Sequence, residues 1–98
     1  MSIATYKSLR KEGVQSPAGG VLRMYVRGLQ DGLEWSNSFM KVQGKPGLFC
    51  APENIALNTE NYIQFIDESL AAPRARPLKE TLPIPFVLLN FLQSNLPC

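Results

Sequence analysis

The residues of this chain that are most able to take part in covalent chemistry are its two cysteines. Cys50 lies in the segment 48–52 and Cys98 ends the sequence. A free thiol at a fraying terminus is open to oxidation, whereas a thiol bonded to a distant cysteine holds that terminus in place. Two cysteines allow one intramolecular pairing, so we expect a Cys50–Cys98 disulfide. Such a bond indicates a bacterial periplasm or the outside of a cell, and the alternative is two reduced thiols in a cytosol.

Other kinds of site chemistry have few residues available. The chain has no histidine, which is the commonest general base and transition-metal ligand. Bonded cysteines form neither a nucleophilic thiol nor a zinc thiolate site. The acidic pairs Asp31 with Glu34 and Asp67 with Glu68 could serve acid–base catalysis, but solvated helix faces explain them better. The segment 44–47 lacks the spacing of a phosphate-binding loop. We therefore expect a binding protein without a cofactor or metal, not an enzyme.

Charge and hydropathy exclude two further classes of partner. The net charge of +2 is too small to indicate nucleic acid, and no apolar span is long enough to insert into a membrane. Residues 1–30 carry five basic side chains and one acid, whereas residues 31–72 carry six acids and two lysines. Packing of these two regions against each other explains this asymmetry best, and a charged partner surface is the alternative. Residues 1–5 do not resemble a signal peptide, so with a disulfide we expect a mature form whose leader has been removed.

Apolar periodicity predicts an all-α fold, a small bundle of about four helices with one disulfide, in a single domain that spans residues 1–98. The expected helices cover residues 2–12, 21–39, 59–72 and 85–95. Segments 13–20, 40–52 and 73–85 are rich in glycine or proline and are expected to be loops, with one possible turn at 78–82. Two helices have clear apolar stripes, which consist of Leu22, Tyr25, Val26, Leu29 and Leu33 in the second helix and of Tyr62, Ile63, Ile66 and Leu70 in the third. The expected polar faces consist of Arg23, Arg27, Gln30 and Glu34 in the second helix and of Asn61, Gln64, Asp67 and Glu68 in the third.

Two glycines inside the second expected helix need an explanation. Gly28 and Gly32 lie four residues apart beside the stripe, and each costs a helix about 1 kcal/mol relative to alanine. Close approach of another helix or subunit would compensate, while simple tolerance of exposed glycines is the alternative. Trp35 and Phe39 add apolar surface that four short helices cannot cover. We therefore predict a two-fold homodimer that uses this surface.

The order of several short motifs resembles that of a known family. The motifs are Tyr25–Gly32, Leu48–Pro52, a helix that ends near Leu70, Phe86–Leu92 and the terminal Leu96–Cys98. Together, over about residues 21–98, they resemble the Rap/Tai immunity proteins, small helical periplasmic proteins that protect type VI secretion bacteria from cell-wall amidase toxins. The chain departs from many relatives because residues 6–21 lack an additional cysteine and because residues 73–85 are unusually rich in proline and charge.

The resemblance implies a homodimer that binds a secreted peptidoglycan amidase and occludes its active cleft, with the loop Ala72–Pro83 as the plug. Prolines reduce the ordering entropy of an exposed loop, and arginine is favoured at interfaces. The expected contact residues are Arg74, Arg76, Lys79 and Glu80; the alternative is an ordinary solvated connection. A periplasmic ligand-binding or envelope-stress protein without a toxin partner is the second hypothesis, which a deep apolar pocket would favour.

Overall fold

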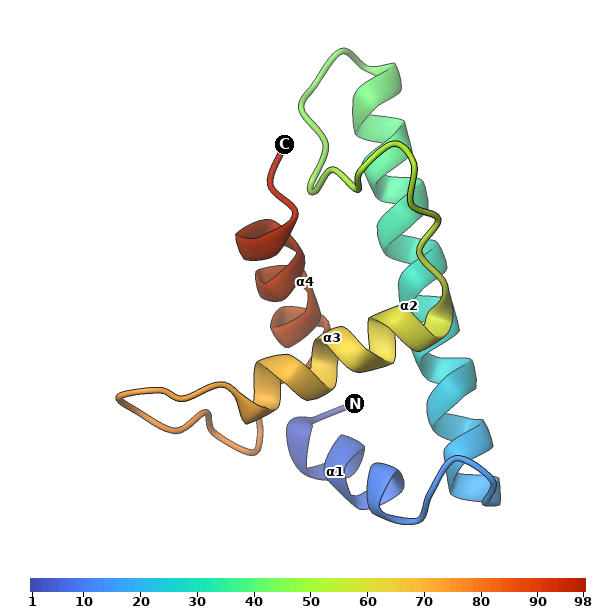
Figure 1. The fold of residues 1–98 in the computed structure, drawn as a ribbon, viewed down its shortest axis with the longest axis vertical. Helices are drawn as coiled ribbons and strands as arrows, with labels where there is room; N and C mark the ends of the chain where they lie inside the picture. The colour runs from blue at the N-terminus through green and yellow to red at the C-terminus, as the bar shows by residue number, and fades with distance from the viewer.

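The computed structural model describes residues 1–98 and confirms the all-α fold. It contains the four helices α1 (Ile3–Lys11), α2 (Pro17–Val42), α3 (Thr59–Ala71) and α4 (Ile84–Asn95) (Figure 1). Helix α2 forms one edge of the molecule and α3 crosses it. Helix α4 packs on α3, and α1 packs on the N-terminal part of α2. No helix is both long and apolar enough to cross a membrane.

Side-chain caps explain where three of the helices begin. Ser2, Ser16 and Asn58 each accept a hydrogen bond from a backbone N–H in the first turn. The expected loop at 13–20 is therefore partly wrong, because α2 begins at Pro17 and not near residue 21. The expected loop at 40–52 also starts too early, because α2 continues to Val42. Proline fits the first helical position, where its missing N–H would have no partner. The Ser16-Pro17 pair, which we interpreted as part of a loop, forms the N-cap and the first position of α2.

A single core joins all four helices and the connection between α2 and α3. Its members are apolar and at most 8% exposed: Ile3, Tyr6, Leu22, Val26, Phe49, Tyr62, Ile63, Ile66, Ile84, Val87, Leu88 and Leu92. The predicted stripe of α3 is confirmed, since Tyr62, Ile63 and Ile66 are buried in this core. Phe49 brings the 43–58 connection into the same core.

The predicted disulfide is confirmed. Cys50 and Cys98 are bonded, with their Cα atoms 4.8 Å apart. The Cys50 N–H also donates to the carbonyl of Leu96 at 2.8 Å. On its other side the connection is tied to α2, because the Asn37 amide donates to the Phe49 carbonyl and accepts from the Phe49 N–H, at 2.8 and 3.2 Å. The 43–58 connection is thus fixed between α2 and the C-terminus.

Two polar residues of α2 do not face solvent as expected. Gln30 is only 8% exposed and accepts a hydrogen bond from the Thr59 hydroxyl at 2.8 Å. Glu34 is half-buried and accepts from the Tyr62 hydroxyl at 3.0 Å. The reason is the crossing of α3 over α2, which covers part of the helix beyond the apolar stripe.

Candidate functional site

The loop Ala72–Pro83 projects from the molecule between α3 and α4 (Figure 1). Residues 72–77 are all exposed, and only Leu78 and Leu82 are half-buried against the core. The second half of the loop, which we call its second limb (residues 78–83), is held to α1. The N–H groups of Ile3 and Ala4 donate to carbonyl oxygens of residues 82 and 80, at 2.9 and 3.0 Å. A hydrogen bond from Leu82 N–H to the Lys79 carbonyl at 3.0 Å forms a turn within the region where one was expected. The loop therefore has a fixed base and a free tip.

Arg74, one of the expected contact residues, is committed to its own chain. Its guanidinium donates to the Ser69 carbonyl at 2.6 Å, to the Ser69 hydroxyl at 3.3 Å and to the Ala72 carbonyl at 3.3 Å. The last carbonyls of a helix have no intrahelical partner, so Arg74 satisfies the C-terminus of α3. Its structural contribution is to set the direction in which the loop leaves α3.

The other three expected contact residues differ in whether they form ion pairs within the chain. Glu80 pairs with Lys7 of α1 at 2.8 Å, and both side chains are about half exposed. Arg76 and Lys79 are exposed and take part in none of the three ion pairs of the structure. Arg76 therefore lies at the free part of the loop without an internal ionic partner, and Lys79 lies on the anchored limb.

The charge asymmetry of the sequence is partly resolved by internal pairing. Arg23 of α2 pairs with Glu60 of α3, and Arg10 of α1 pairs with Asp67 of α3 at 3.1 Å. Both pairs join the basic N-terminal region to the acidic middle region. This geometry supports the interpretation that the two regions pack against each other.

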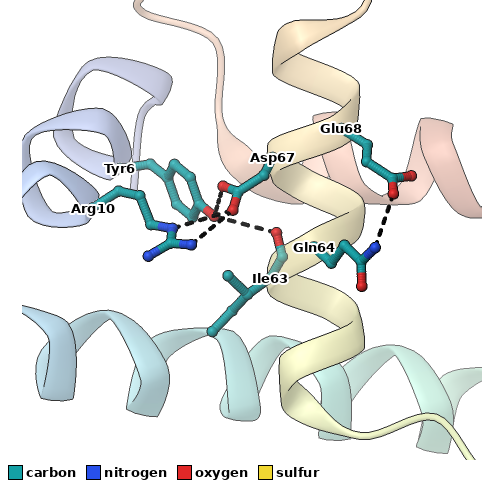
Figure 2. Close-up of polar contacts among 6 residues, drawn as sticks. All are labelled: Tyr6, Arg10, Ile63, Gln64, Asp67 and Glu68. Carbon is teal, nitrogen blue, oxygen red and sulfur yellow. Dashed lines mark hydrogen bonds and ion pairs between the residues drawn. The ribbon is translucent and has the colours of Figure 1, made fainter. Parts of the chain in front are cut away.

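Asp67 of α3 points toward α1 and is half-buried, whereas a solvated face was expected (Figure 2). It accepts from the Tyr6 hydroxyl at 2.6 Å and from Arg10 Nε at 3.1 Å, whereas its neighbour Glu68 accepts from Gln64 at 3.1 Å. Burial, and then the adjacent carboxylate, raise the pKa of Tyr6 above its ordinary value. Because Asp67 and Glu68 have separate partners, they do not form a joint acid–base site.

No enclosed cavity in the structure has the size of a small-molecule site. The two largest hollows, of about 350 Å³ beside α3 and α4 and about 300 Å³ beside α2, are open to solvent and lined in large part by polar residues. The best-enclosed cavity holds about 30 Å³ and lies between α1, α2 and α3, with Leu9, Leu22 and Ile63 in its wall. Ligand pockets usually measure about 300–1,000 Å³, so this cavity has room for water and little else. A hollow of about 250 Å³ beneath the 72–83 loop is open to solvent and is partly lined by the charged groups of Lys7 and Arg74. The deep apolar pocket that would favour a ligand-binding protein is not seen.

The residues expected at a dimer surface all lie on α2, the helix at the edge of the molecule opposite the projecting loop (Figure 1). Trp35 and Phe39 are 75% and 62% exposed, and no atom outside α2 approaches the Cβ positions of Gly28 and Gly32. No other element of the chain therefore covers these glycines. The sequence analysis missed the neighbouring exposed residues Val21, Met24 and Val42, although their spacing of three or four places them on the same helix face.

No protein-family model, curated protein or solved structure matches the chain. The function must therefore be inferred from the residues and their geometry.

Proposed function

We propose that this protein is a periplasmic immunity protein. It binds a type VI secreted peptidoglycan amidase, occludes the active cleft of that toxin and acts as a homodimer. The observation that carries the proposal is the projecting 72–83 loop, which has an anchored base and an exposed tip with an unpaired arginine, Arg76.

The loop has the physical properties of a preorganised binding element. Pro73, Pro77 and Pro83 restrict its backbone, and Arg74 fixes its first limb to α3. Less conformational entropy is then lost on binding, which leaves more of the contact energy as affinity. A guanidinium can donate to carboxylates or carbonyls in a cleft through several hydrogen bonds, so Arg76 is the expected anchor.

Two further observations agree with this proposal. The Cys50–Cys98 disulfide suits an oxidising compartment such as the periplasm. The motifs that resemble the Rap/Tai immunity proteins include the residues around both cysteines, and the structure brings those residues together. The bond thereby links the connection before α3 to the segment that follows α4.

The proposal predicts a gene for a peptidoglycan amidase beside the gene of this chain, and the test uses that amidase and the purified, oxidised chain. We expect the wild type to bind and inhibit this enzyme, and to protect cells that express the enzyme in the periplasm. Arg76→Ala should weaken binding by about 2 kcal/mol, roughly 30-fold, without changing the melting temperature. Lys45→Ala is the matched control, because Lys45 is an exposed cation in another loop.

Two outcomes would count against the proposal. Absence of binding by the wild type to the neighbouring amidase would remove the function itself. Normal binding by both Arg76→Ala and Lys79→Ala would remove the loop as the plug, and would direct the search to the exposed polar face of α3 around Gln64 and Glu68.

A further inference from the structure

An apolar stripe runs along the solvent side of α2 for most of its length. It consists of five side chains that are 56–84% exposed: Val21, Met24, Trp35, Phe39 and Val42. At 3.6 residues per turn these five positions fall within roughly one-sixth of the helix circumference. Gly28 lies within the same arc and Gly32 lies beside it. The stripe faces away from Leu22 and Val26, which α2 buries in the core.

The exposed apolar area of the stripe is larger than that of a single exposed apolar residue. A buried Trp or Phe removes about 150–250 Å² from water, so Trp35 and Phe39 at their exposures leave roughly 200–350 Å² of aromatic surface in solvent. Val21, Met24 and Val42 extend this surface toward the about 800 Å² that each partner contributes to a standard interface. Exposed apolar surface of this size along one face of a helix is typical of an interaction site.

We infer that the occupant of this stripe is α2 of a second copy of the chain, packed antiparallel about a two-fold axis between Asp31 and Gly32. This inference rests on the homodimer of the proposed function and specifies its surface and register. Each residue then lies opposite the one equally far from the axis on the partner. Trp35 faces the partner's Gly28, Phe39 faces the partner's Met24, and Val42 faces the partner's Val21.

Size complementarity favours this register. The largest side chain of the stripe, Trp35, lies opposite a glycine whose Cβ position is in open space. An indole ring can therefore occupy the gap without displacing any side chain. The same pairing explains why a long helix retains Gly28 at a helix-propensity cost, since the residue that fills the gap belongs to the other copy.

The charges beside the stripe are compatible with this arrangement. Arg27 takes part in no ion pair of the structure. In the antiparallel register Arg27 lies about two residues along the axis from the partner's Glu34, on the same flank of the interface. The two Asp31 carboxylates lie near the axis on the same flank of the interface, at the solvent edge, where water screens their repulsion and Arg27 of the same helix is one turn from each.

The first test is the oligomeric state of the oxidised chain, measured by sedimentation and light scattering over a concentration series. We expect a monomer–dimer equilibrium in the micromolar range. Gly28→Leu should weaken dimerisation at least roughly tenfold, because it fills the gap for Trp35. The melting temperature of the dilute monomer should not fall, because a side chain at residue 28 meets nothing in the monomer. Gln64→Leu, which adds a leucine to the exposed face of α3, is the control and should dimerise as the wild type does.

Engineered cysteines test the register. Gly32→Cys should form a disulfide with its own copy, because the two positions differ by one residue along the axis. Gly28→Cys should not bond to itself, since its two copies would lie about 10 Å apart along the axis. Peptide mapping confirms that Cys50 and Cys98 stay paired. A parallel dimer would cross-link at both positions and would overturn the inference.

Other outcomes also separate this inference from the proposed function. A wild type that stays monomeric but binds the amidase removes the α2 dimer and leaves the immunity function. Dimerisation unaffected by Gly28→Leu and by Trp35→Ser places the interface elsewhere. Recruitment of a monomeric wild type to anionic lipid vesicles, lost in Trp35→Ser, would assign the stripe to a membrane surface and also overturn the inference.

Discussion

Single polar side chains fix the C-terminal end of α3 and its contact with α1. Tyr6 and Arg10 both hydrogen-bond Asp67, and Arg74 holds the carbonyl end of the same helix. A hydroxyl–carboxylate hydrogen bond of 2.6 Å is short, as expected when the acceptor is charged. These contacts give each residue a measurable effect on folding that is separate from any effect on a partner.

Tyr6→Phe should reduce the free energy of unfolding by about 1–2 kcal/mol at neutral pH, because it removes the hydroxyl donor from Asp67. Tyr25→Phe is the control and should cost less, since the Tyr25 hydroxyl takes part only in a 3.4 Å contact with the N-terminal amine. Urea unfolding of both variants measures the difference. Equal losses would mean that the Tyr6–Asp67 bond adds little.

The same tyrosine predicts how stability depends on alkaline pH. The pKa of Tyr6 in the folded chain is raised above 10.0, first by burial and then by Asp67, and the pKa of Tyr62 is raised first by burial and then by Glu34. Above pH 10 the unfolded chain therefore releases protons that the folded chain retains. Stability should be unaffected by these groups below that pH and should fall progressively above it. Unfolding curves between pH 8 and about pH 11 should show a shallower decline for Tyr6→Phe than for the wild type.

Arg74→Ala should lower the free energy of unfolding by about 1 kcal/mol, because it leaves the last carbonyls of α3 to solvent and frees the start of the loop. The value is at the lower end for hydrogen bonds of charged groups, since Arg74 is exposed. Arg76→Ala is the matched control and should stay within about 0.5 kcal/mol of the wild type. Thermal melting of the two variants decides whether Arg74 is structural, and identical curves would show that it is not.

At the scale of elements, the start of α2 shows how closely two segments can approach. Gly19 is buried, and a Cβ at this position would lie 2.8 Å from the backbone of Val14 and also against the Gly13 carbonyl. The adjacent Gly20 has open space at its Cβ position. The turn between α1 and α2 therefore packs onto one specific glycine of the helix.

Gly19→Ala and Gly20→Ala should change stability in opposite directions. We expect Gly19→Ala to cost roughly 1–3 kcal/mol, because backbone atoms must move to admit the methyl group. Gly20→Ala should stabilise the chain by about 0.4–1 kcal/mol through its lower unfolded-state entropy. Chemical denaturation of the two variants tests the pair. A stable Gly19→Ala would contradict the close packing described here.

At the scale of the whole molecule, the disulfide joins two segments that lie 48 residues apart in the sequence. The 43–58 connection and the C-terminus are linked by the Cys50–Cys98 bond and by the hydrogen bond from Cys50 N–H to the Leu96 carbonyl, beside the core that Phe49 enters. The molecule is flattened, with extents of 41 × 33 × 22 Å, so a small core must stabilise a wide surface. A covalent link between two segments then matters more than in a rounder domain.

Reduction should lower the free energy of unfolding substantially, with about 4 kcal/mol as the upper value for a closed loop of this length. The measurement is melting with and without a reductant, preceded by thiol titration of the oxidised chain, which should find no free thiol. A Cys50→Ala/Cys98→Ala variant should melt as the reduced wild type does and should not respond to reductant. Two reactive thiols in the folded, oxidised protein would refute the bond and the oxidising compartment together.

The sequence by itself determined the helices, most of their boundaries and the disulfide. Helical periodicity, N-caps such as Asn58 and the pairing of only two cysteines are local or combinatorial signals, which need no knowledge of how the elements pack. The start of α2 was missed because Ser16-Pro17 is typical of both a loop and a helix N-terminus.

Only the tertiary structure decided which polar residues are buried and which charges are free. The crossing of α3 over α2 covers Gln30 and Glu34, and α1 covers Asp67, although all three lie on faces that the periodicity marks as polar. Arg74 and Arg76 look equivalent in sequence, but only the geometry of the α3 terminus brings Arg74 to the end of the helix. The physical reason is that interhelical contacts depend on crossing angles and loop paths, which the local pattern of a chain does not encode.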